Sequence, residues 1–171
     1  ARAMFTGAQP ERWSEVRTLQ EQAAAQGWAT AFLAGNIYLS STFEMDRGWG
    51  LHRFLNLPRA NLQLRRARAW LDSVADQPSL LVVHLMDAHL PYNEPRAFRH
   101  RFAGEQPAGL GPERFVRRHV LDAEERLGAD ELGYVRDRYD NNIAWIDDQL
   151  GGFLRELRPQ DLVVVLSDHG E

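Results

Sequence analysis

The sequence predicts an α/β protein, with a layered α/β/α domain built around a largely parallel central sheet. Two observations predict this fold class. Segments of helical periodicity are followed by short apolar runs of strand length, and this order repeats three times. The apolar runs carry Leu and Val at consecutive positions, which is typical of strands that are covered on both faces, as in parallel sheets. We therefore expect one domain over residues 1–171.

The first helix and strand are expected near the start of the chain. Residues 11–26 place apolar side chains at helical spacing, and the segment stops before Gly27, a residue common just past a helix: the apolar positions are Trp13, Val16, Leu19 and Ala23. The run "WATAFLAGN" at residues 28–36 then predicts a strand that leaves this turn.

The second pair lies in the middle of the chain. Residues 61–75 predict a helix, with an apolar stripe made of Leu64, Ala67, Leu71 and Val74. Pro78 ends it, and "LLVVHLM" at residues 80–86 predicts a buried strand. His84 lies inside this apolar strand and is expected to be a core histidine with its hydrogen bonds satisfied, whereas His52, His100 and His119 are expected at the surface.

The third pair closes the sequence. Residues 96–130 are rich in charge, Gly and Pro and predict an excursion over the surface. One long helix follows and is expected to pack inward a stripe of Leu132, Val135, Tyr139, Ile143, Ile146, Leu150, Phe153 and Leu157. It is expected to end at Pro159, and "LVVVL" from Leu162 predicts a last buried strand.

Composition excludes several classes of function. The net charge is −4, from 24 acidic and 20 basic residues, and the sequence has no basic block that would indicate nucleic-acid binding. It has no Cys, which excludes disulfides, zinc–thiolate sites and a thiol nucleophile in this stretch. No apolar run approaches the ~18 residues of a transmembrane helix. The absence of Cys does not indicate a cellular compartment.

Polar residues follow two of the predicted strands. Asp87 and His89 come after the second, and Asp168 and His169 after the third. Carboxyl ends of parallel strands are where open α/β sheets bind ligands, and Asp with His suits a divalent cation. The alternative has equal weight at this point, because Asp and Gly are also ordinary turn formers. Neighbouring strand residues point to opposite faces, so Asp168 and His169 share one ion only if the chain bends, which Gly170 permits.

Five motifs, taken together and in order, resemble the sulfatase family of the alkaline phosphatase superfamily. The final "LVVVLSDHGE" resembles the metal-binding Asp-His-Gly segment, and "VVHLMDAHLPY" the His-Leu-x-Asp-x-His-x-Pro-Tyr stretch. The run "YDNNIAWIDDQLGGFLREL" is similar to the helix before the metal segment, and "QGWATAFLAGNIYLSSTFEMDRGWG" to the segment after the first helix. The initial "RAMFTG" resembles the tail of the signature Cys-x-Pro-Ser-Arg.

The resemblance implies roles for particular residues. Asp168 and His169 would be metal ligands, with calcium as the first choice of metal and magnesium or manganese as alternatives. His89 would be catalytic and substrate-binding, as a hydrogen-bond donor to the ester or a proton donor to the leaving group. The nucleophile would lie four residues before Arg2, whose guanidinium would orient it and neutralise the charge of the ester.

The sequence departs from the family pattern after the first strand. Many sulfatases have Gly-Lys-Trp-His-Leu-Gly there, and this chain has "GNIYLS", so Asn36 and Tyr38 replace a Lys and a His that contact the ester. Asn36 is a candidate substrate-binding residue on this alignment. Both residues are equally well interpreted as plain strand-end residues. The change leaves room for a branch of the superfamily that acts on phosphate or phosphonate esters.

The expected function is that of a metal-dependent sulfuric ester hydrolase acting on a small-molecule or glycan sulfate ester. The alternatives are a phosphoryl-type ester or phosphonate hydrolase or transferase of the same superfamily, and a non-catalytic sulfatase-like module. The chain is expected to be an incomplete domain, the middle part of a longer one. Alone it is expected to be inactive, with no nucleophile and half a metal site. The resemblance implies a periplasmic or extracellular protein.

Overall fold

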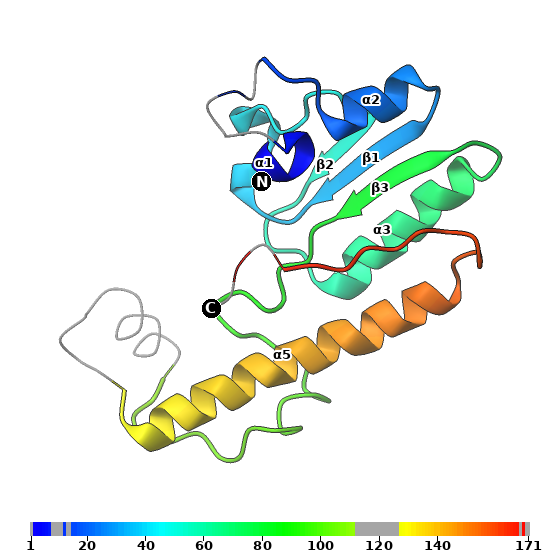
Figure 1. Ribbon diagram of the computed structural model, residues 1–171. Coiled ribbons are helices and arrows are strands. Elements are labelled where there is room, and N and C mark those ends of the chain that lie inside the picture. Colours follow the sequence, from blue (N-terminus) through cyan, green and yellow to red (C-terminus); the bar gives the residue numbers. More distant parts are fainter. Residues whose placement is uncertain (1, 8–11, 13–14, 112–126, 168, 170–171) are drawn as a thin grey trace. The chain divides into compact units, whose positions relative to one another are not determined.

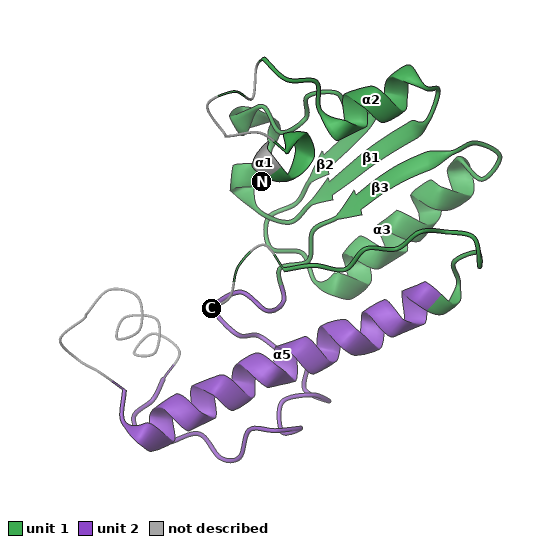
Figure 2. Cartoon of the chain, viewed as in Figure 1, with its two compact units in different colours: residues 1–86, 155–171 green, residues 87–154 purple. Residues whose placement is uncertain are grey.

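The computed structural model describes residues 2–7, 12, 15–111, 127–167 and 169 (Figure 1). The chain forms two compact units (Figure 2). Unit 1 comprises residues 1–86 and 155–171, and unit 2 comprises residues 87–154. The expectation of one domain over residues 1–171 stays a prediction.

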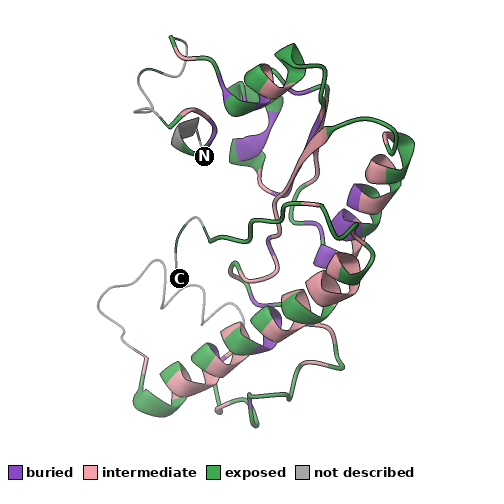
Figure 3. Cartoon of the chain, turned by 45° about the vertical axis from the view of Figure 1, so that its right-hand side comes forward, coloured by how far each residue is buried: buried purple, intermediate pink, exposed green. Residues whose placement is uncertain are grey.

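Unit 1 contains a parallel sheet of three strands in the order β2-β1-β3 among its described residues. The strands are β1 (Ala29–Ala34), β2 (Leu51–Phe54) and β3 (Ser79–Val83). Ala31 of β1 pairs with Leu51 of β2 on one side and with Leu81 of β3 on the other. The last five residues of β1 are buried, because this central strand is covered on both faces (Figure 3). The predicted fold class, α/β with a parallel sheet, is thus confirmed.

The helices of unit 1 are α1 (Arg2–Thr6), α2 (Leu19–Ala25) and α3 (Ala60–Ser73), with two short 3-10 turns, η2 (Ile37–Leu39) and η3 (Ser41–Phe43). Figure 1 shows α2 and α3 beside the sheet. The α3 helix matches the expectation for residues 61–75. The first predicted helix is shorter than expected, because Thr18 caps α2: its side chain accepts from the backbone N of Glu21, whose own side chain accepts from the backbone N of Thr18.

The core of unit 1 lies around β1 and is strongly aromatic. Phe5, Phe32 and Trp49 form three ring pairs, each with ring centroids 5.5 Å apart. Ala34, Leu39 and Met45 complete the buried cluster. Phe5 is 3% exposed, so it ties α1, which begins at Arg2, to the sheet. Aromatic pairs at this distance stabilise a core beyond the area that they bury.

Two strand expectations need correction. Residues 51–54 form β2 although the sequence does not predict a strand there, because only four residues, "LHRF", pair with β1 and their periodicity is too short to recognise. The predicted last strand from Leu162 is not formed. Residues 162–166 have no strand assignment and all five side chains are exposed, from 45% for Val163 to 92% for Leu162 (Figure 3). A strand requires a partner for its backbone groups, which composition alone does not reveal.

Unit 2 is organised by α5 (Ala129–Arg155), whose last residue passes into unit 1. The long helix is predicted correctly, but its inward face is different from the expected stripe. Leu132 and Ile143 are exposed. Val135 of the expected stripe is buried, and so are Asn141 and Asn142, which the stripe did not include. The helix therefore contacts the preceding loop through polar side chains as well as through an apolar cluster of Val135 with Tyr92 and Leu110. Of the predicted excursion at residues 96–130, residues 112–126 lie outside the described residues.

Candidate functional site

In unit 1 the carboxyl ends of β1 and β3 lie close together. Backbone N–H of His84 donates to the carbonyl of Leu33 at 3.0 Å, which continues the β1–β3 ladder by one residue. Gly35 follows β1, and a Cβ atom at this position would lie 2.8 Å from the carbonyl oxygen of His84 and 2.9 Å from Cγ of Met86. A glycine is therefore required here by the close approach of β3. Asn36 is the next residue along the chain.

Asn36 caps the 3-10 turn that follows β1. Its side-chain Oδ1 accepts a hydrogen bond from the backbone N of Tyr38 at 3.0 Å. This contact uses one lone pair of the amide oxygen and leaves the Nδ2 group as a hydrogen-bond donor. Tyr38 is 68% exposed, and its ring packs on Phe43 with centroids 5.2 Å apart. Asn36 is therefore the cap at the end of β1, an interpretation that the sequence left open. This cap leaves Nδ2 able to donate a hydrogen bond.

The remaining candidates in unit 1 lie near the two ends of the sequence. Arg2 is the first residue of α1. Asp168 lies outside the described residues. His169 is exposed, and its backbone carbonyl accepts a hydrogen bond from the hydroxyl of Ser167. The metal-ligand prediction for Asp168 and His169 thus stays a prediction.

In unit 2, His89 is exposed and fixed at one ring nitrogen. Its Nδ1 lies 2.6 Å from the carbonyl oxygen of Leu90. A carbonyl oxygen can only accept, so Nδ1 carries the hydrogen in this contact. In the neutral ring Nε2 therefore holds a lone pair, and in the imidazolium it becomes a second donor. The orientation of the ring follows from the backbone of the loop that carries it.

Asp87, two residues earlier, is engaged by α5. Its Oδ1 accepts a hydrogen bond from the indole Nε1 of Trp145 at 2.9 Å. The Trp145 ring also packs edge-on against Phe98, with centroids 5.4 Å apart. One oxygen of Asp87 is thus used to hold the loop on the helix. This contact gives Asp87 a structural role that the sequence did not distinguish from metal binding.

A buried ion pair follows His89 along the loop, and the sequence did not predict it. The carboxylate of Glu94 is 0% exposed and accepts from Nε and Nη2 of Arg138, each at 2.7 Å. Asn142 Nδ2 adds a third hydrogen bond at 3.2 Å. Burial alone would raise the pKa of Glu94, but the hydrogen bonds and the charge of Arg138 hold it below its ordinary value. The available signal was the polar run "RYDNN" inside an otherwise apolar helix period.

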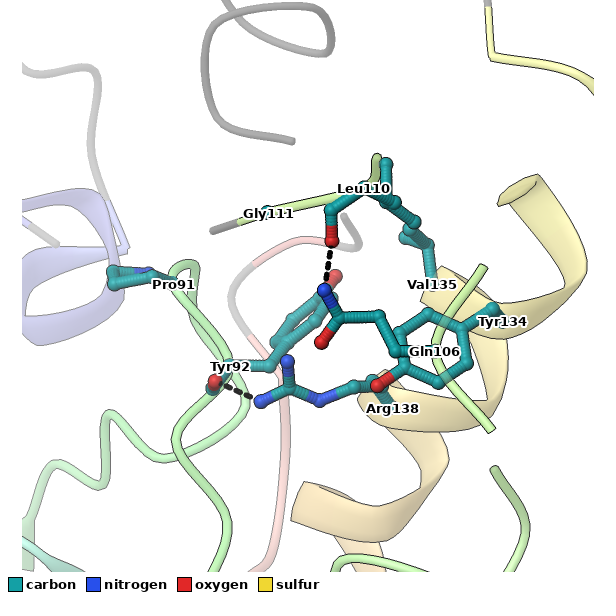
Figure 4. A pocket seen from close by; sticks show the side chains of 8 residues that line it. All are labelled: Pro91, Tyr92, Gln106, Leu110, Gly111, Tyr134, Val135 and Arg138. Atoms are coloured by element: carbon teal, nitrogen blue, oxygen red, sulfur yellow. Dashed lines mark hydrogen bonds between the residues drawn. The ribbon is translucent and has the colours of Figure 1, made fainter. Parts of the chain in front are cut away.

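Arg138 also lines a small hollow in unit 2 (Figure 4). Its Nη2 donates to the carbonyl of Tyr92, and Gln106 donates to the carbonyl of Leu110 across the same hollow. The volume is about 30 Å³, room for about one water molecule. This hollow is too small for an ester substrate.

The residues that the structure describes do not assemble a metal site. Over that part of the chain, which leaves out Asp168, no three His, Cys, Asp or Glu side chains are grouped closely enough to hold an ion. His169, one of the predicted ligands, is exposed, and the carboxylate of Asp87 accepts a hydrogen bond from Trp145. Of the helices described, none is long and apolar enough to cross a membrane.

Two solved structures have similar folds, both of the C-terminal periplasmic domain of EcEptC from Escherichia coli. The one in complex with Zn has a TM-score of 0.64 and 18% sequence identity, over 90% of this chain and 43% of that chain. The other has a TM-score of 0.64 and 16% identity, over 91% and 42%. The chain thus spans less than half the length of either solved chain.

A search of curated proteins found no match. A family model described as Sulfatase matches residues 2–171. This range includes α1 and the final Asp-His-Gly segment, so the resemblance drawn from five separate motifs is confirmed. The chain belongs to the sulfatase family.

Proposed function

We propose that the chain carries part of the active site of a metal-dependent hydrolase of sulfuric esters, acting on a small-molecule or glycan sulfate ester. Membership of the sulfatase family supports the reaction class. The observation that carries the proposal is His89, an exposed imidazole with Nδ1 held on the carbonyl of Leu90 and Nε2 directed by that contact. It lies in the loop after β3, where α/β sheets place ligands.

In this proposal His89 acts as the general acid. The nucleophile, which the resemblance places before Arg2, bonds to the sulfur as the S–O bond to the leaving group breaks. The bonding electrons pass to the leaving oxygen, and the imidazolium donates its Nε2 proton to that oxygen. The Nδ1 contact with Leu90 keeps the ring oriented in both protonation states, because Nδ1 donates in each. Asn36 offers its Nδ2 amide to a sulfate oxygen, and the Arg2 guanidinium neutralises charge on the ester.

A divalent metal remains part of the proposal, with Asp168 and His169 as its ligands. Calcium is the first candidate, with magnesium or manganese as alternatives; the EcEptC domain, by contrast, was solved in complex with Zn. The described residues do not form a metal site on their own, so no step is derived through the metal. In the full-length protein, Asp168→Ala should reduce bound divalent metal in elemental analysis. Unchanged metal content would reject this ligand.

The central test uses a series of aryl sulfates with leaving groups of increasing pKa. His89→Ala in the full-length protein should lower kcat by about 10²–10⁴-fold for poor leaving groups and much less for good ones, as expected for a lost general acid. His100→Ala is the matched control, because His100 is an exposed histidine of the same unit. A uniform loss across the series would assign His89 to binding, and no loss would reject both roles.

Phosphate or phosphonate esters are the second candidate substrates. The neutral Asn36 caps the turn after β1 at the position where the family pattern has a Lys, and this departure leaves room for such substrates. Turnover of matched aryl sulfate and aryl phosphate esters by the full-length protein would decide between them, and no turnover of either would favour a non-catalytic module. The isolated 171-residue chain should turn over neither, because the resemblance places the nucleophile before Arg2.

A further inference from the structure

We propose that Arg138 is a positioning residue for His89. With Trp145 it fixes the two ends of the loop segment 87–94, and His89 lies between these fixed points. The proposal rests on the proposed function, in which the imidazole of His89 in this segment is catalytic. It adds residues of α5, far along the sequence, to the machinery of the site.

The first fixed point follows His89. The Arg138 guanidinium makes a two-pronged contact with the Glu94 carboxylate, 2.7 Å at each prong. It also donates to the carbonyl of Tyr92 (Figure 4). Asn142 closes the arrangement on Glu94 and donates back to the carbonyl of Arg138 at 2.8 Å. Main chain and side chain of residues 92–94 are therefore held by one guanidinium.

The second fixed point precedes His89. Trp145 donates from Nε1 to Asp87 at 2.9 Å. Positions 138, 142 and 145 are spaced as i, i+4 and i+7, which places them along one face of α5. The segment that carries His89 is thus attached at both sides to a single rigid face, and the helix geometry sets the separation of the two attachments.

The chemistry of the contact suits positioning better than stabilisation alone. A buried ion pair is weak support for stability, since well-packed apolar residues of similar volume often serve as well. The planar guanidinium fork instead fixes orientation, because two parallel hydrogen bonds form in one geometry. His89 itself contacts the backbone of Leu90, so its place depends on the loop backbone. Displacing a catalytic group by about 1 Å can cost about 10²-fold in rate.

Arg138→Met in the full-length protein should lower kcat for aryl sulfates by about 10–100-fold with a much smaller change in KM, and with the steeper leaving-group dependence expected for His89→Ala. Arg136→Met is the matched control, the same charge change at an exposed position of the same helix, and should leave kcat unchanged. In the double variant His89→Ala/Arg138→Met the two losses of kcat should not add. Arg138→Met lowers kcat by displacing the His89 imidazole, and this effect disappears when the imidazole is already removed.

A milder variant covers the case in which Arg138→Met does not fold. Trp145→Phe keeps an aromatic side chain that can pack on Phe98 but removes the five-membered ring with its Nε1–H donor, and it should lower kcat in the same leaving-group-dependent way. Additive losses in the double variant, or equal kcat for Arg138→Met and Arg136→Met, would overturn the proposal.

Hydrogen exchange separates this proposal from the proposed function. Backbone amides of residues 88–93 should exchange faster in Arg138→Met and in Trp145→Phe than in Arg136→Met, whether or not the protein turns over a sulfate ester. If the wild-type protein shows no turnover, the proposed function fails and exchange alone decides the positioning role. Unchanged exchange at residues 88–93 would then reject it.

Discussion

Replacing Gly35 by Ala tests how the strand ends in unit 1 are held. The added Cβ would approach the carbonyl oxygen of His84 to 2.8 Å and Cγ of Met86 to 2.9 Å, closer than real Cβ atoms come to such neighbours. The thioether side chain of Met86 can turn aside. The His84 carbonyl cannot, because it is main chain at the end of β3, so β1 and β3 must move apart locally. Overpacking of this kind costs about 1–3 kcal/mol.

The assay for Gly35→Ala is urea unfolding followed by circular dichroism, with the free energy of unfolding compared between variants. Gly104→Ala is the control, because a Cβ there meets no atom within 4 Å, and its effect should stay within about 0.5 kcal/mol. A Gly35→Ala protein as stable as Gly104→Ala would refute the close packing of the strand ends.

Three further predictions concern stability. Phe32→Ala should lower the free energy of unfolding by about 3–5 kcal/mol in urea melts, because the ring is 1% exposed and packs on Phe5 and Trp49. Gly133→Ala should raise it by about 0.5–1 kcal/mol, since the helical position has space for a Cβ, and a drop would show strain there. The folded-state pKa of Glu94 lies below its ordinary value of 4.5, so its stabilising contribution is full above that pH and is lost as the pH falls through the folded value. Acid unfolding of Glu94→Gln should show a weaker pH dependence in that window, and an unchanged one would exclude this group.

The sequence predicted the elements whose pattern matches their packing. The central strand β1 was predicted from the run "WATAFLAGN" after the first helix, and its last five residues are buried. The α3 helix was found from a stripe in which Leu64 and Ala67 are indeed buried. In these elements local composition and tertiary environment agree, so the hydrophobic period alone is sufficient.

The prediction was incomplete where buried polar contacts add to the apolar packing. In α5 the apolar period correctly indicated a helix, but Asn141 and Asn142 are buried while Ile143 is exposed. Asn141 accepts from the backbone N of Phe102 and donates to the carbonyl of Arg99, at 2.9 and 2.7 Å. A buried amide of this kind is stable only with both partners present, and these partners are distant in the sequence. Periodicity within one helix carries no information about such partners.

The segment 162–166 gives a direct comparison between the sequence expectation and the structure. The run "LVVVL" predicted a buried strand, yet Val164 is 70% exposed and Leu166 is 61% exposed. Val164→Thr should therefore change the free energy of unfolding of the 171-residue chain by no more than about 0.5 kcal/mol, as at other exposed positions. Amides of residues 162–166 should also exchange as fast as those of an unpaired loop.

A buried strand would give the opposite result. Exchanging a buried methyl for a hydroxyl without a partner costs about 1–3 kcal/mol, and the amides of a paired strand are protected. Val83→Thr is the comparison within β3, where the side chain is only partly exposed and the strand is paired, and its effect should exceed that of Val164→Thr. Equal costs for the two substitutions, together with protected amides at residues 162–166, would show that the five consecutive apolar residues do form a strand in this chain. Unequal costs with fast exchange would instead show that β-propensity alone does not form a strand. Over the residues that the structure describes, no strand pairs with the backbone N–H and C=O groups of this run.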